Sequence, residues 1–381
     1  MYKQDIIGQN LIKKQLKKML FEKTYPQSQI FIDPNGYGGL PLAINNGLNL
    51  IYGLEKMEEY EKNKIPFSTL ISHPDLHFVY PSITKSKTSS SPPNSNLLSS
   101  WRDFITSSPY GEIYDWLKLL DSGNKQGIIN VEEVLKIQQK MSLKSHSGGN
   151  KVLIIWGAEK LNSQASNKLL KIIEEPPENS YFILVTEKSS SLLPTLISRC
   201  QRIKLAPIES QEITDALKQY DIKTDKIKLV KFSKGSWRKI LKNIFNKEER
   251  ETFEKYLIEF LKICFNIKKS KKAIIDLFNW SDSISSLDRE KQKAFIEYVL
   301  EAMRQCLLIT YKSSQLVDFQ HFENLDLQKL SAHVHSKNIQ QIATLLEKTI
   351  YFLERNGNSK IIFSSFSIAL VRELNVKELS S

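Results

Sequence analysis

The stretch from Lys151 to Leu205 constrains the fold more than any other part of the sequence. It contains two all-apolar runs, Val152 to Ile155 and Tyr181 to Val185, and between them a helical segment that ends at Pro176-Pro177. An apolar run without polar alternation is typical of a strand that is covered on both faces. The stretch therefore predicts a βαβ unit within a parallel sheet.

The carboxyl ends of parallel strands are where such sheets bind ligands and partners. Trp156 and Gly157 follow the first apolar run, Thr186 follows the second, and Ser198-Arg199-Cys200 comes shortly after. We therefore expect any chemistry of this chain to lie at these residues.

Length and composition indicate a soluble protein of two or three domains. The chain has 381 residues with 41% hydrophobic content, which is ample for real cores. No apolar run approaches the length that spans a membrane, so we expect a cytoplasmic protein without a membrane partner. The three cysteines lie far apart and outside any CxxC spacing, so neither a disulfide framework nor a bound metal is expected.

The charge is basic and unevenly distributed. Lys and Arg outnumber Asp and Glu by 54 to 42, and residues 201 to 250 carry thirteen of the former against seven of the latter. A basic region of this kind is compatible with a polyanion or an acidic protein surface as partner. A solvated lysine-rich surface explains the same composition without any partner.

A second motif lies near the amino terminus, where the strand-like run Ser28 to Ile32 leads into a glycine-rich turn and a helix. This is the frame of a phosphate-binding loop, which needs a Lys and a Ser or Thr directly after its last glycine. Gly39 and Leu40 occupy those places, and Asp33 replaces the opening glycine with a carboxylate that would repel phosphate. The predicted degenerate loop, with no cofactor of its own, comprises Asp33, Gly36, Gly38, Gly39 and Leu40.

The end of the first apolar run gives an independent check. A phosphate-loop ATPase places an Asp there to hold Mg²⁺, usually with a Glu beside it. Trp156 and Gly157 stand at those positions, and Glu159, two residues further on, is interpreted as a solvated residue that leads a helix. Losses in both halves of one site predict an inactive ATPase.

The segments between these motifs are less specific. We interpret Thr84 to Ser100 as a mobile low-complexity loop, Trp101 to Leu120 as an inserted helical hairpin of open purpose, and His73 with His77 as part of a polar turn. Ser210 is expected to cap a helix in a basic helical unit that continues to Phe245.

A helical bundle is expected from about Lys247 onward. Two apolar stripes at helical spacing indicate it. They are Phe253, Leu257, Phe260, Leu261 and Cys264, and Ile339, Ile342, Leu345, Leu346 and Phe352.

Taken in order, four motifs make the chain resemble bacterial clamp-loader subunits of the AAA+ superfamily, most closely the delta-prime family of the DNA polymerase III holoenzyme. The resemblance covers roughly residues 1 to 245, and only the helical bundle matches beyond them. The motifs are Ile6-Ile7-Gly8-Gln9, the glycine turn after Ile30-Phe31-Ile32, Asn167 to Lys171 leading to Glu174-Glu175-Pro176-Pro177, and Leu193-Pro194-Thr195 with Ser198-Arg199-Cys200.

The resemblance implies an α/β AAA+ domain of the P-loop NTPase type with a parallel sheet and a degenerate nucleotide site, at residues 1–205. It further implies a small helical lid domain at residues 206–245 and an all-α collar domain for oligomerisation at residues 246–381. Many family members carry a four-cysteine zinc module, but this chain has no cysteine in the corresponding region.

The resemblance also implies a function. In that family, motor subunits of a five-member ring bind ATP and Mg²⁺, and the delta-prime subunit is non-catalytic. Carried onto this chain, Arg199 is an arginine finger that acts in trans on the ATP of the neighbouring subunit, with Ser198 and Cys200 as supporting motif residues.

The implied partners are clamp-loader subunits of the gamma/tau and delta types. Through the complex the chain would serve the sliding clamp and primed DNA in DNA replication. It would thus be a subunit of a DNA-directed DNA polymerase, a nucleotidyltransferase, without ATPase activity of its own.

Two other interpretations stay open at this point. The chain could be an active ATPase subunit of the gamma/tau type, which Gly39, Leu40 and Trp156 oppose, or a basic DNA-binding adaptor outside a clamp-loader ring. Arg238 stands where motor subunits keep a nucleotide-sensing arginine, but the degenerate loop leaves no nucleotide for it to sense.

Overall fold

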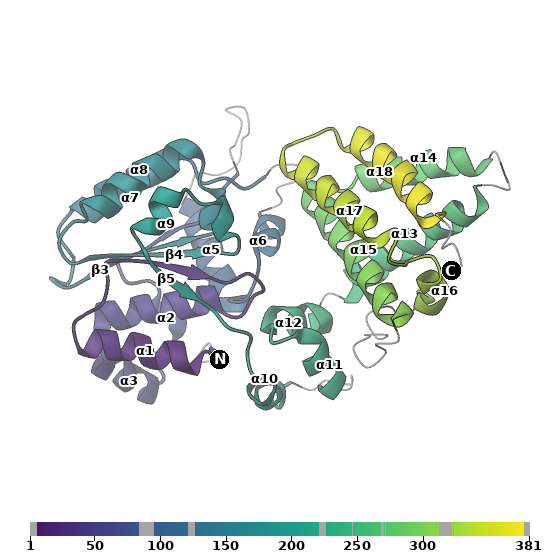
Figure 1. Cartoon of the computed structure of the whole chain (residues 1–381). Coiled ribbons are helices and arrows are strands. Elements are labelled where there is room, and N and C mark those ends of the chain that lie inside the picture. Colours follow the sequence, from purple (N-terminus) through teal and green to yellow (C-terminus); the bar gives the residue numbers. More distant parts are fainter. Residues whose placement is uncertain are drawn as a thin grey trace. The chain divides into compact units, whose positions relative to one another are not determined.

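The structure, a computed structural model, describes residues 6–83, 95–120, 126–220, 226–245, 247–267, 270, 272–311, 322 and 324–376. The chain divides into two compact units (Figure 1). One comprises Met1–Ser122 and Gly127–Ile240, and the other comprises Gly123–Gln126 and Leu241–Ser381. The domain boundaries expected after residues 205 and 245 stay predictions.

The first unit is built on a five-stranded parallel sheet with the strand order β2-β3-β4-β1-β5. The strands are β1 (Ser28–Ile32), β2 (Leu76–Val79), β3 (Lys151–Trp156), β4 (Ser180–Thr186) and β5 (Gln201–Lys204). The predicted α/β fold with a parallel sheet is confirmed. Because β4 lies between β1 and β3, the carboxyl ends of these three strands meet at one edge of the sheet.

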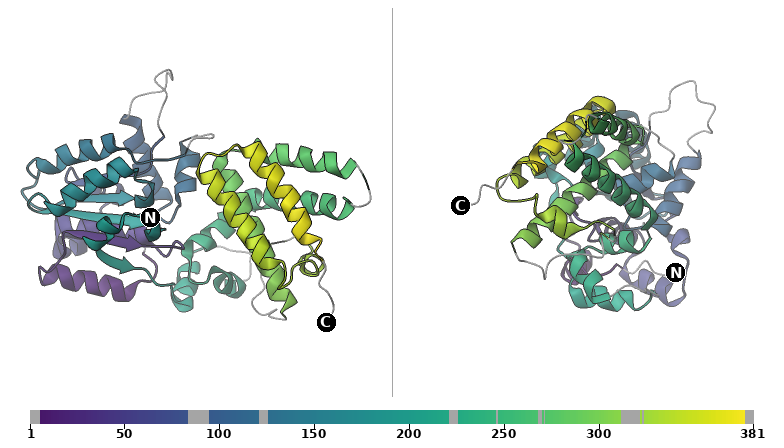
Figure 2. Two further views of the ribbon diagram at one scale, coloured as in Figure 1. Left: turned by 45° about the horizontal axis from the view of Figure 1, so that its top comes forward. Right: turned by 90° about the vertical axis from the view of Figure 1, so that its right-hand side faces the viewer.

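Helices cover both faces of the sheet (Figure 1 and Figure 2). The helices α7 (Val131–Ser142), α8 (Ser163–Glu174) and α9 (Pro194–Ser198) lie over one face. The other face is covered by α1 (Asn10–Phe21), α2 (Gly39–Tyr52), α5 (Ser95–Ser107) and α6 (Ile113–Leu119), with α3 (Leu54–Lys62) and α4 (Phe67–Leu70) packed beside them.

The apolar run of β3 divides between these two faces. Leu153 and Ile155 pack with α7 and α8, whereas Val152, Ile154 and Trp156 pack with α2 and α5. Successive side chains of a strand point to opposite faces, so a strand covered on both sides must be apolar throughout. The same alternation places Trp156, the last residue of β3, on the side of α2 and α5.

The inserted hairpin is present as α5 and α6, which confirms that prediction. Residues 84–94 of the predicted mobile loop lie outside the described residues. The remainder of that prediction is wrong, because Ser95–Ser100 form the first turns of α5. The side chains on one face of this helix are buried in the core, and this packing holds the helix in place. They are Trp101, Phe104 and Ile105.

Three short helices follow β5: α10 (Ser210–Leu217), α11 (Lys226–Ser233) and α12 (Trp237–Phe245). The boundary between the two units falls within α12. The prediction that Ser210 caps the first of them is wrong. Glu209 is the N-cap residue, and its N–H donates to the side chain of Glu212 at 3.4 Å. A carboxylate three residues into a helix satisfies the backbone of the cap in this way.

Gln9 links these helices to the sheet. Its Nε2 donates to the carbonyl oxygens of Ala206 at 2.6 Å and Tyr37 at 3.3 Å. The motif residue therefore joins the segment after β5 to the turn after β1. Nearby, Gly235 has a φ of 81°, and a Cβ there would lie 2.5 Å from Pro207, so only glycine fits.

The second unit is a bundle of six helices within the described residues: α13 (Lys247–Asn266), α14 (Lys272–Ser285), α15 (Arg289–Thr310), α16 (Leu327–Ser331), α17 (Ile339–Glu354) and α18 (Ser359–Leu374). The first apolar stripe is buried as predicted. In the second, Phe352 is 51% exposed and the prediction for it is wrong, because Ile342, Leu346 and Leu353 form the buried face of α17.

None of the helices formed by the described residues is long and apolar enough to cross a membrane.

Trp280 in α14 tests the packing of this bundle. Its ring is 2% exposed, lies 4.8 Å from that of Phe260, and donates from Nε1 to the Tyr256 carbonyl at 2.9 Å. Trp280→Ala should lower the free energy of unfolding by about 3–5 kcal/mol in urea titrations followed by circular dichroism. Ile275→Ala, on the same helix at 62% exposure, should change it by less than about 0.5 kcal/mol. Equal effects of the two substitutions would contradict the packing described.

Candidate functional site

The turn between β1 and α2 is closed by a carboxylate of its own. Asp33 is 4% exposed and accepts hydrogen bonds from the backbone N–H groups of Tyr37 at 2.6 Å, Gly38 at 3.1 Å and Gly39 at 2.7 Å. Backbone N–H groups at this place, at the start of a helix, are the donors that hold phosphate in a phosphate-binding loop. The sequence suggested only that Asp33 repels phosphate, whereas the structure shows that its carboxylate occupies the donors.

Gly39 stands at the position of the phosphate-binding lysine, and the Asp33 side chain leaves no room for a larger residue there. A Cβ added at Gly39 would lie 2.8 Å from the Asp33 Cβ, closer than real Cβ atoms approach other atoms. A side chain at position 39 therefore requires Asp33 to move. Asp33 and Gly39 both depart from the phosphate-loop motif, and the position of the Asp33 side chain requires glycine at position 39.

Trp156 fills the place of the Mg²⁺-binding carboxylate with an aromatic cluster. Its side chain is 4% exposed, and its ring centroid lies 5.2 Å from that of Trp101 and 5.6 Å from that of Phe104. Both partners belong to α5. The inserted hairpin, whose purpose the sequence left open, thus packs directly against the degenerate strand end.

Glu159 lies in the short 3-10 turn after β3 and is partly buried. Its Oε2 accepts a hydrogen bond from the Thr186 hydroxyl at the end of β4 at 2.7 Å. The interpretation of Glu159 as a solvated residue is therefore wrong. The partner comes from the neighbouring strand, 27 residues away in sequence.

The side chain of Arg238, in the first turn of α12, lies against Gly36 in the turn between β1 and α2. Its Nη1 lies 2.6 Å from Glu187 Oε1, and its Nε donates to the Tyr110 carbonyl at 2.8 Å. A Cβ at Gly36 would lie 2.5 Å from the Arg238 Cβ, so glycine is needed for this close approach.

The electrostatics of this contact favour a charged arginine. Burial by itself lowers the pKa of Arg238, but the carboxylates of Glu187, Glu112 and Asp33 more than reverse this, so its pKa is raised. The guanidinium is held by carboxylates of its own chain. It is therefore not free to contact the phosphates of a nucleotide.

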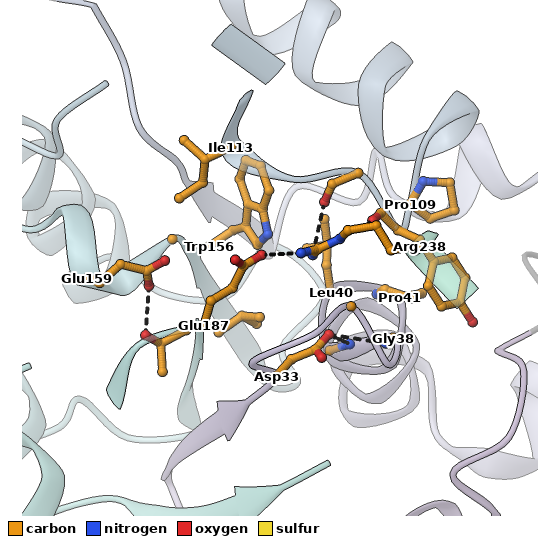
Figure 3. A pocket seen from close by; sticks show the side chains of 17 residues that line it. Asp33, Gly38, Leu40, Pro41, Pro109, Ile113, Trp156, Glu159, Glu187 and Arg238 are labelled. Atoms are coloured by element: carbon orange, nitrogen blue, oxygen red, sulfur yellow. Dashed lines mark hydrogen bonds and ion pairs between the residues drawn. The ribbon is translucent and has the colours of Figure 1, made fainter. Parts of the chain in front are cut away.

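The space left between these side chains is about 10 Å³, room for roughly one water molecule. Figure 3 shows Glu187 pointing at Arg238, with Trp156 and Ile113 beside them and Asp33 turned into the loop at Gly38. Pockets that hold small molecules measure about 300–1,000 Å³. In this conformation the pocket is too small for a nucleotide.

The Ser-Arg-Cys segment lies outside the lining of this pocket. Arg199 is the C-cap residue of α9, directly after Ser198. Its Nε lies 2.6 Å from Glu174 Oε1 of α8, and the two side chains are 42% and 44% exposed. Ser198 donates to the Thr195 carbonyl at 3.0 Å. Cys200 is buried, which raises the pKa of its thiol to about 12 and makes it unreactive.

The structure places the Ser198-Arg199-Cys200 segment but does not test its expected function. Arg199 is at the surface, in an ion pair, and its role in trans stays a prediction. Within the described residues, no group of three or more His, Cys, Asp or Glu side chains is placed to hold a metal ion.

Comparison with known proteins adds a family. Residues 8–209 match the model of the family described as "DNA polymerase III, delta subunit". The DNA polymerase III subunit delta' of Haemophilus influenzae is 42% identical over 85 residues, which are 22% of this chain and 26% of that protein. Its counterpart in Buchnera aphidicola subsp. Baizongia pistaciae is 30% identical over 204 residues, 51% of this chain and 60% of that protein.

The matches therefore span about a quarter to three fifths of the length of these curated relatives. Among solved structures, a DNA polymerase III gamma subunit-related protein from Thermotoga maritima aligns over 95% of this chain and 99% of that chain. The identity is 16% and the TM-score is 0.41.

Asp33→Ala tests the self-filled loop. Removing the carboxylate leaves three N–H groups without their acceptor, so the free energy of unfolding should fall by about 1–3 kcal/mol. Inorganic phosphate should then raise the thermal midpoint of this variant by more than that of the parent protein, because only the variant exposes the three N–H groups. Asp103→Ala, which removes an exposed carboxylate from α5, is the control. An equal phosphate response in all three proteins would refute the assignment.

Proposed function

Because the chain belongs to the "DNA polymerase III, delta subunit" family, we propose that it is a non-catalytic delta-prime-type subunit of a bacterial clamp loader. In this role it binds no ATP or Mg²⁺ and hydrolyses none. It helps to load the sliding clamp onto primed DNA during DNA replication. The observation that carries the proposal is the Asp33 carboxylate in the place of a phosphate.

The closed pocket opposes the alternative of an active gamma/tau-type motor. That alternative requires ATP to displace the Asp33 carboxylate, the Arg238–Glu187 pair and the ring of Trp156 together. It also requires a phosphate-binding lysine, for which Gly39 has neither the side chain nor the space. A non-catalytic subunit requires none of these changes.

Arg199 has properties that suit a finger acting on a neighbour. Its guanidinium is always charged and planar, so it can meet the charge that spreads over a γ-phosphate. Its present partner, Glu174, is 44% exposed, and an exposed ion pair contributes only about 0–1 kcal/mol. The phosphates of a neighbouring ATP can therefore take Arg199 from Glu174 at little cost.

The proposed partners are clamp-loader subunits of the gamma/tau and delta types, with the clamp and DNA reached through the complex. Apolar side chains on the bundle support assembly, since large exposed apolar groups mark interaction surfaces. In α14 these are Ile274, Ile275 and Phe278, which are 48%, 62% and 47% exposed. Replication in bacteria takes place in the cytoplasm, where we place the chain.

Arg199→Ala tests the finger in a complex reconstituted with gamma/tau and delta subunits. Hydrolysis at the site that the finger completes should fall by ~10³-fold or more, as for arginine fingers of GTPases. The measurement is ATP turnover stimulated by clamp and primed DNA. Arg202→Ala, an exposed arginine three residues further on, should leave turnover unchanged.

Glu174→Gln separates the finger from its resting ion pair. It should keep full turnover, because the pair serves only the isolated chain. The proposal is wrong if Arg199→Ala and Arg202→Ala give the same turnover in complexes that assemble equally.

A further inference from the structure

A second cavity lies at the opposite edge of the sheet, where β2 and β3 begin. Its volume is about 380 Å³, within the ~300–1,000 Å³ range of pockets that hold small ligands. It is bounded by β2 and the turn before it, by α5, by α7 and the loop that follows, and by the start of β3. Its polar lining includes His73, His77, Arg102, Lys140, Lys144 and Lys151.

The lining carries a strong excess of positive charge. Arg102, Lys140, Lys144 and Lys151 contribute four cations, and Asp75 contributes the one carboxylate. Asp75 is 4% exposed and is already bound by the loop after α7. It accepts from the Ser145 hydroxyl at 3.0 Å, the His146 N–H at 2.9 Å and the Ser147 N–H at 3.2 Å. Its charge thus holds the loop rather than the cations.

The cations lack carboxylate partners within the part of the chain that the structure describes. Lys151 donates to the carbonyls of Met141 and Leu143, and Lys140 and Lys144 make no ion pair there. The Nε of Arg102 is buried and finds no hydrogen-bond partner among the described atoms. Buried polar groups are nearly always paired, and an exception calls for a bound ion, a water or a ligand.

The lysines of the cavity also affect the pKa of a histidine in its lining. Burial lowers the pKa of His77 to about 4, with Lys140 and Lys151 lowering it further against the opposing effect of Asp75. The pKa of His73 is also lowered, again first by burial. Both imidazoles are neutral at pH 7. The ring of His73 is already bound, because its Nδ1 accepts from the Asp75 N–H at 3.1 Å and its Nε2 lies 3.1 Å from the Ser147 hydroxyl. His77 offers one N–H donor. The cavity therefore combines an excess of cations with the neutral donor of His77.

From this arrangement we propose that the cavity binds the phosphate groups of a ligand. Arg102 supplies a planar fork of N–H donors, and Lys140 and Lys144 supply mobile point charges, which is the combination that recognises phosphate. The site is formed at the amino edge of the sheet, from residues that the closed pocket and Arg199 do not use. It stands independently of the clamp-loading function.

The histidine ring signals of the full-length chain give a direct test. Inorganic pyrophosphate, added at constant ionic strength and pH 7, should shift the ring resonances of His73, His77 and His146 in a saturable way. Those of His333 and His335, which lie in the other unit, should not move. Sulfate-free chloride at the same ionic strength should reproduce none of the shifts.

Matched double variants locate the site. Lys140→Ser with Lys144→Ser should weaken pyrophosphate binding by roughly tenfold or more, as expected when charged hydrogen-bond donors are lost. Lys14→Ser with Lys136→Ser removes the same charge from exposed positions on α1 and α7 and should leave the affinity unchanged. Equal weakening by both pairs, or no saturable shift in the parent protein, would overturn the proposal.

A final arm identifies the source of the phosphate. A short single-stranded oligonucleotide that displaces pyrophosphate, with the same dependence on Lys140 and Lys144, identifies a nucleic-acid backbone. Pyrophosphate binding without displacement identifies a small phosphate compound. Both results support the cavity as a phosphate site.

Discussion

The hydrogen bonds from Tyr37, Gly38 and Gly39 to the Asp33 carboxylate fix the turn on which the first unit depends. A phosphate-binding loop folds around an anion, and here the anion is covalently part of the loop. The start of α2 therefore has its donors satisfied without a ligand. The side chains that cover this turn then pack against a surface that no nucleotide needs to enter.

Neighbouring contacts follow from that closure. Arg238 lies against Gly36 and pairs with Glu187, which joins the short helices after β5 to the sheet. Gln9 makes a second connection between the same parts through Ala206 and Tyr37. Protein groups supply both sides of each contact. This agrees with the non-catalytic role proposed above.

The sequence was sufficient for the sheet and for the loss of the ATPase residues, because both depend on local patterns. The apolar runs of β3 and β4 can be recognised without knowing which residues they pack against. Gly39 and Trp156 stand at positions where an ATPase motif requires a lysine and an aspartate. The contents of the pocket depend on residues distant in the chain. Asp33 can accept three N–H groups only because the backbone turns at Gly36 and Gly38, with φ of 73° and 107°.

The contacts of other side chains could not be predicted from the sequence, because their partners are also distant in the chain. Trp156 is buried by Trp101, 55 residues earlier, and Glu159 is bound by Thr186 on another strand. The ion pair of Arg199 with Glu174 joins two helices whose crossing no local pattern reveals. The prediction that Phe352 belongs to the apolar stripe of α17 was wrong for a simpler reason. Phe352 adjoins the buried Leu353, and helical spacing alone did not separate the two.

The central claim is that this chain carries its own anion where an ATPase would bind a nucleotide. Isothermal titration of the full-length chain with Mg²⁺-ATP, in the Lys140→Ser, Lys144→Ser variant that weakens the second cavity, measures this most directly. The account predicts no saturable binding at millimolar ATP, together with an unchanged thermal midpoint. Binding of one ATP per chain with a micromolar dissociation constant would contradict it.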